Sequence, residues 1–79
     1  MYEILTMITE PKKEAGSWIG EIWLKNINTN DARLFETVID TDPAMFRYWL
    51  NASIKAVEQA MNTCDIDEMW LCYESILYQ

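Results

Sequence analysis

A change of hydrophobic period at Thr41-Asp42-Pro43 constrains the fold of this chain more than any other feature. Beyond it, apolar residues recur at the three- and four-residue spacing of an amphipathic helix. Asp42 is a favoured N-cap residue, and Pro43 suits the first helical position. We therefore predict one long helix over residues 43–62. Its apolar stripe comprises Phe46, Leu50, Ser53, Val57 and Met61.

The segments on either side of this helix have the composition of strands. Residues 2–9, 17–27 and 32–39 are rich in β-branched, aromatic and other apolar residues, and so is the segment 68–78 after the helix. Polar turns separate the first three strands at 10–16 and at 28–31. The expected order is β-β-β-α-β. It predicts a single α+β domain over residues 1–79, with one helix packed on one face of a mostly antiparallel sheet.

The predicted sheet carries apolar side chains on both faces, because successive residues of a strand point to opposite sides. Trp18 and Ile22 share one face, whereas Ile19 and Trp23 share the other. One helix covers one face only, so the second face keeps exposed aromatic residues among charges, which is typical of a binding surface. We expect a homodimer or a partner protein there, with Trp23 and Trp70 as anchors. The alternative is that loops cover this face.

The charge balance restricts the class of partner. Thirteen acidic residues against six basic ones give a net charge of −7, and the sequence pI is about 4.3. Binding to nucleic acid or to an anionic membrane requires a basic patch, so neither is expected as a direct partner. A strongly negative chain favours steered encounter with a basic protein surface. The alternative is that the charge serves solubility alone.

Targeting signals and cysteine spacing indicate the compartment. The N-terminus lacks the basic and long apolar regions of a signal peptide, and no apolar run is long enough to cross a membrane. Cys64 and Cys72 are eight residues apart and do not form a zinc-binding pattern in a chain without histidine. We therefore expect a cytoplasmic protein with a reduced cysteine pair, a disulfide being the minor alternative.

The residues that catalysis needs are largely missing. Without histidine, neither a Ser-His-Asp nor a Cys-His site can form. Gly16 and Gly20 are the only glycines, so no glycine-rich phosphate-binding loop exists. The acidic run 65–68 lacks the glycine and distal glutamate of a calcium loop, and we interpret it as a solvated turn. The sequence predicts no enzymatic activity, no cofactor and no metal site.

The predicted element order resembles the first half of the ribonuclease H fold. The run 46–56 is similar in pattern to that family's first helix, and 71–75 (Leu-Cys-Tyr-Glu-Ser) occupies the place of a family strand that ends in a Thr-Asp-Ser-like triplet. Thr6, Thr9 and Trp49 stand where the family places metal-binding acids, and only Glu74 is an acid near the right place. The resemblance therefore implies topology rather than metal-dependent nuclease activity. A degenerate ribonuclease H-like domain is one alternative reading.

A second resemblance concerns the overall profile. A short acidic domain with many aromatic residues and no catalytic set is similar to phage-encoded anti-defence proteins, such as anti-CRISPR and anti-restriction inhibitors. That resemblance implies an inhibitor that covers a basic, nucleic-acid-handling protein by mimicking nucleic acid. A self-associating structural subunit is the alternative. The partner-binding residues predicted on this basis are Glu10, Glu14, Trp23, Asp31, Asp65, Asp67, Glu68 and Trp70.

Overall fold

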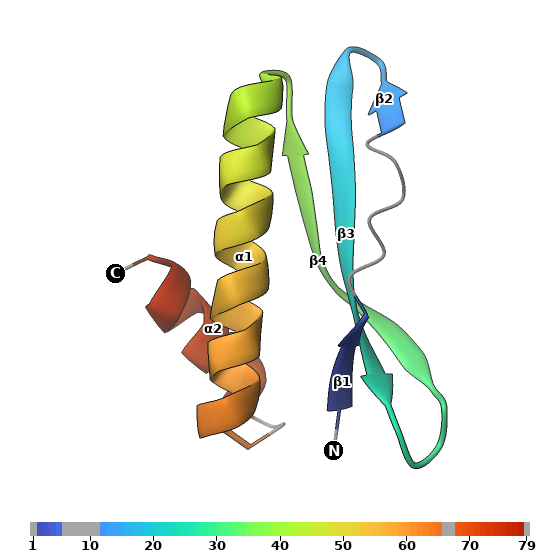
Figure 1. Ribbon diagram of the computed structural model, residues 1–79, viewed down its shortest axis with the longest axis vertical. Coiled ribbons are helices and arrows are strands. Elements are labelled where there is room, and N and C mark those ends of the chain that lie inside the picture. Colours follow the sequence, from blue (N-terminus) through green and yellow to red (C-terminus); the bar gives the residue numbers. More distant parts are fainter. Residues whose placement is uncertain (1, 6–11, 66–67, 79) are drawn as a thin grey trace.

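The computed structural model describes residues 2–5, 12–65 and 68–78, and it consists of a sheet layer and a layer of two helices (Figure 1). In chain order the strands are β1 (Tyr2–Leu5), β2 (Lys12–Glu14), β3 (Ser17–Asn26) and β4 (Ala32–Asp40). The helices are α1 (Pro43–Thr63) and α2 (Met69–Leu77). The α+β class and the antiparallel sheet with a helix on one face are confirmed.

Strand β3 is the centre of the sheet. β1 and β2 pair with its two halves along one edge, and β4 pairs with it along the other, all antiparallel. Between Ile22 and Trp23 the register with β4 shifts, because Ile22 pairs with Glu36 whereas Trp23 pairs with Leu34. Phe35 is the extra residue of this β-bulge. Because of the bulge, the side chains of Phe35 and Glu36 lie on the same side of the sheet, the side that the helices cover.

The turn predicted at 10–16 is shorter than expected, because Lys12–Glu14 form strand β2. Its two turn residues are Ala15 and Gly16, with φ of 53° and 81°. Two successive positive φ angles are those of a type I′ turn, whose twist matches that of the flanking strands. The ten residues of β3 extend well past four-residue β1, so a paired position is available for β2.

Helix α1 begins where the sequence predicts. The Asp42 carboxylate accepts a hydrogen bond from the Ala44 N–H at 2.9 Å, and Pro43 follows as the first helical residue. The helix lies across the sheet beside Gly20, where the absence of a side chain gives room for Phe46 and Leu50. The buried residues of α1 are Phe46, Ser53, Ala56, Val57 and Ala60.

The prediction of a final strand over residues 68–78 is wrong, because residues 69–77 form helix α2. Apolar residues in this segment recur at three- and four-residue spacing as well as in alternation, so the pattern fits both structures. As a helix the segment buries Met69 and Tyr73 against α1, and it leaves Leu71 in solvent. No edge of β3 is available to a further strand, since β1, β2 and β4 occupy both.

The core lies between the sheet and both helices. Ile22 and Leu24 of β3 face α1, and α2 closes the same cluster from the side (Figure 1). The fully buried cluster comprises Ile22, Leu24, Ala56, Val57, Ala60, Met69 and Tyr73. Because α2 supplies two of these residues, it belongs to the folded core rather than to a loose C-terminal extension.

Candidate functional site

The segment that forms the last turns of α1 and helix α2 carries acidic side chains and no basic ones. After Lys55 the sequence contains five of the thirteen acidic residues and none of the six basic ones, so most of the net charge of −7 belongs to this segment. Four of these acids are described and exposed: Glu58, Asp65, Glu68 and Glu74. We call these four residues, together with Trp70 and Leu71, the acidic helical end.

Exposed apolar side chains accompany these acids. Trp70 is 44% exposed and Leu71 is 71% exposed, both on α2. The Trp70 ring packs against two aromatic neighbours, Phe35 at 5.2 Å and Tyr73 at 5.4 Å between ring centroids. Aromatic packing of this kind fixes the indole before any partner arrives, and a pre-ordered aromatic side chain is a favourable anchor for binding.

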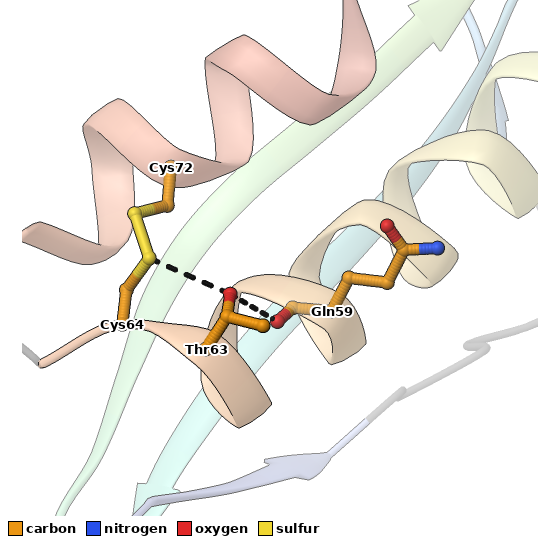
Figure 2. The surroundings of a disulfide bond; sticks show 4 residues. All are labelled: Gln59, Thr63, Cys64 and Cys72. Carbon is orange, nitrogen blue, oxygen red and sulfur yellow. Dashed lines mark hydrogen bonds between the residues drawn. A yellow bond between two sulfur atoms is a disulfide. The ribbon is translucent and has the colours of Figure 1, made fainter.

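A disulfide between Cys64 and Cys72 ties the end of α1 to α2 (Figure 2). The reduced pair expected from the sequence is therefore wrong for this structure: the chain reverses after α1, which brings the two Cα atoms to 6.7 Å. The disulfide lies in an open hollow that Glu68, Leu71 and Ser75 help to line. This hollow borders the acidic helical end.

A partly buried polar contact joins α2 to the sheet. The Tyr73 hydroxyl donates a hydrogen bond to the Glu36 carboxylate at 3.0 Å, and the other carboxylate oxygen accepts the Thr37 N–H at 2.9 Å. Burial raises the pKa of Tyr73 to about 12, the Ser53 hydroxyl opposes this rise, and the charge of Glu36 adds to it. The phenol is a neutral hydrogen-bond donor, and we assign it a structural role.

The structure brings together only part of the predicted partner-binding set. Asp65, Glu68 and Trp70 belong to the acidic helical end, and the Glu68 N–H donates to the Asp65 carbonyl at 2.9 Å. Glu14, the last residue of β2, and Asp31, in the turn before β4, are exposed at the two opposite ends of β3 (Figure 1). Because a ten-residue strand is about 33 Å long, these two residues cannot share one small patch. The predicted residues Glu10 and Asp67 lie outside the described residues.

The two predicted tryptophan anchors lie on opposite sides of the sheet. Trp23 is directly opposite Leu34 and therefore faces away from the helices, as predicted. Its indole N–H is buried and has no hydrogen-bond partner among the described residues. Trp70, expected on the same open face, projects instead from helix α2 beside Phe35. The prediction of one face bearing both anchors is therefore wrong.

Glu58, Glu74 and Leu71 belong to the acidic helical end, but sequence reasoning did not select them. The absence of any basic residue after Lys55 is a signal that points to the two acids. Leu71 had no comparable signal, because its exposure depends on α2 being a helix.

The described residues offer no candidate metal site. Within 2–5, 12–65 and 68–78, no three acidic or cysteine side chains are close enough to hold a metal ion. The segment 71–75, which the ribonuclease H resemblance assigns to a strand, lies in α2, where Glu74 is exposed.

None of the described helices is both long and apolar enough to span a membrane. Comparisons with protein-family models, curated proteins and solved structures find no match.

Proposed function

We propose that the protein is a non-enzymatic interaction protein that binds a basic, nucleic-acid-handling protein through the acidic helical end and blocks or regulates it. This profile corresponds to a nucleic-acid mimic of the phage anti-defence type. The observation that carries the proposal is the segregation of charge, because the segment after Lys55 holds acids without a single base.

Acidic residues gathered on one part of the surface orient a basic partner, whereas the net charge alone does not. A surface of one sign concentrates its electrostatic potential and steers a partner of opposite sign into one orientation. Glu74 is exposed on α2, Glu68 is exposed at the N-cap of that helix, and Asp65 lies in the turn before it. Their carboxylates stand in for the phosphates that a Lys/Arg-lined groove ordinarily binds.

Affinity beyond steering needs a desolvated apolar contact, and Trp70 and Leu71 offer one. Both belong to α2, whose position is fixed by the disulfide and by buried Tyr73. A rigid helix that presents an aromatic anchor beside acids loses little conformational entropy on binding. We therefore assign Trp70 as the anchor and the acids around it as the steering charges.

The test is competition with nucleic acid. A panel of basic nucleases and defence proteins is loaded with fluorescent duplex DNA, and displacement by this protein is followed by anisotropy at low and moderate salt. We expect displacement from at least one panel member, weakened by moderate salt. Glu68→Lys with Glu74→Lys should reduce the association rate, and Trp70→Ala should weaken the complex by about 2 kcal/mol, mainly through faster dissociation.

A matched control separates the acidic helical end from net charge. Glu14→Lys with Asp31→Lys changes the net charge equally, but at the two opposite ends of β3. This control should displace DNA as well as the unmodified protein does. Equal loss in both double variants would attribute binding to net charge alone, and failure to displace DNA anywhere on the panel would contradict the proposal.

A second candidate, a self-associating structural subunit, is favoured by the sheet rather than by the helices. Leu34 and Ile39 on the open face of β4 are 44% and 60% exposed. Large aliphatic side chains exposed on the same face of a strand are typical of an interface. The DNA-displacement test distinguishes the two candidates, because a subunit that only self-associates does not displace nucleic acid from a basic protein.

A further inference from the structure

Strand β4 is an edge strand whose outer side is unpaired in the described part of the chain. The Thr37 N–H donates to the Glu36 carboxylate at 2.9 Å, so it points away from β3. Hydrogen-bonding direction alternates along a strand, so Ile39 also presents its backbone groups outward. Across the bulge at Phe35, Leu34 does the same. The outer edge of β4 thus offers three residues with outward backbone groups.

The same three residues carry the side chains of the open face. Thr37 pairs with Glu21, Ile39 with Ile19 and Leu34 with Trp23, all on the side away from the helices. Leu34 and Ile39 are largely exposed, whereas Thr37 between them is half-buried. A strand added along this edge would cover apolar side chains and satisfy backbone groups at the same time.

We propose that the occupant of this edge is the β4 strand of a second copy of the chain, in an antiparallel pair with its two-fold axis at Thr37. In this register Leu34 of each copy lies opposite Ile39 of the other. Arg33 of each copy lies opposite Asp40 of the other. The apolar residues therefore meet each other, and each basic residue meets an acidic one.

The bulge is what makes this register self-complementary. An unbulged strand with its axis at Thr37 would place Leu34 opposite Asp40 and Arg33 opposite Thr41. The extra residue Phe35 shifts the first half of β4 by one position, and this shift places Leu34 opposite Ile39 on the open face. The result is one continuous antiparallel sheet across two chains. This inference does not rest on the proposed binding at the acidic helical end.

Glu36 determines how readily the edge pairs. In a single chain its carboxylate already accepts the Thr37 N–H. This bond satisfies one donor of the unpaired edge and so disfavours non-specific pairing with other strands. In the dimer the partner's Thr37 carbonyl takes over that N–H, and Glu36 keeps its bond to Tyr73. The exchange replaces one hydrogen bond by another, so we expect a reversible dimer. Moderate salt should favour it by screening the repulsion between two chains of charge −7.

The experiment is sedimentation equilibrium from low micromolar to near-millimolar protein. We expect the mass to rise from the 9.3 kDa of one chain toward twice that value. Arg33→Asp and Asp40→Arg should each raise the dimer Kd about tenfold, because two symmetric pairs change from attraction to repulsion. The double swap should restore the dimer. Arg47→Asp is the control, because it makes the same charge change as Arg33→Asp on the exposed surface of α1. It should leave the dimer Kd unchanged.

A second variant guards against unfolding, because the Asp40 carboxylate also accepts the Asp42 N–H before α1. Ile39→Lys alters a largely exposed side chain and should give a folded monomer by circular dichroism. Hydrogen exchange adds a direct reading, since the amides of Thr37 and Ile39 should gain protection with concentration. A mass of 9.3 kDa at every concentration, or a dimer that Ile39→Lys does not dissociate, would overturn the inference.

Discussion

The Tyr73 hydroxyl of α2 donates a hydrogen bond to the Glu36 carboxylate of β4 at 3.0 Å, across a sequence separation of 37 residues. Glu36 also accepts the Thr37 N–H, so its two oxygens link the C-terminal helix to the backbone of the sheet edge. Phe35 adds an edge-on contact with the Tyr73 ring at 5.1 Å. In addition to its packing on α1 and the Cys64–Cys72 disulfide, α2 is therefore tied to the sheet through β4.

Removing the phenol oxygen should destabilise the fold measurably. Tyr73→Phe keeps the buried ring but leaves the Glu36 carboxylate without this donor, which we expect to cost about 1–2 kcal/mol of unfolding free energy. Tyr78→Phe is the matched control, because Tyr78 is 72% exposed. Urea unfolding followed by circular dichroism measures both. Equal stability of the two variants would mean that the Tyr73–Glu36 bond contributes nothing to the fold.

The raised pKa of Tyr73 predicts a loss of stability in alkali. The ordinary pKa of 10.0 applies to the unfolded chain, and burial raises it to about 12 in the fold. Between these values the unfolded chain releases a proton that the folded chain keeps, so the unfolding free energy falls as pH rises. The contribution is fully present below pH 10 and is lost as pH passes 12. Tyr73→Phe should show a shallower decline, together with loss of the last phenolate absorbance step.

The start of α1 and the bounds of β3 and β4 were predictable because they depend on residues close together in the sequence. Asp42 and Pro43 predicted the start of α1, because capping and proline geometry involve adjacent residues. β3 and β4 were also predicted to within one residue at each end. The helix α2 was not, because its residues satisfy helical and alternating patterns alike, and packing against α1 decides between them.

The candidate site was predictable only in part for the same reason. Asp65, Glu68 and Trp70 were selected from charge and aromatic character, and they do lie together. Glu14 was grouped with them by charge alone, although it is the last residue of β2 and pairs with Ser17 of β3. The disulfide and the Glu36–Tyr73 bond depend on how α2 folds back, and no single stretch of sequence encodes that.

The Cys64–Cys72 disulfide should stabilise the fold by constraining the unfolded chain. It closes a loop over a sequence separation of eight residues, for which chain entropy predicts about 2–3 kcal/mol. Adding a dithiol reductant should lower the unfolding free energy by that amount. The Cys64→Ser, Cys72→Ser double variant should match the reduced protein and show no response to the reductant. An unmodified protein that unfolds identically with and without reductant would contradict this prediction.

The close approach of α1 to β3 should make Gly20 intolerant of a side chain. A Cβ atom there would lie 2.9 Å from the tip of the Phe46 ring and 3.1 Å from a Leu50 methyl group. Phe46 is itself buried and cannot move aside freely, so Gly20→Ala should cost about 1–3 kcal/mol in urea unfolding.

Phe46→Leu removes the ring tip and supplies the test of that mechanism. The double variant should lose less stability than the sum of the two single variants, because the shortened side chain makes room for the new methyl group. Additive losses would show that Gly20 is needed for a reason other than contact with Phe46.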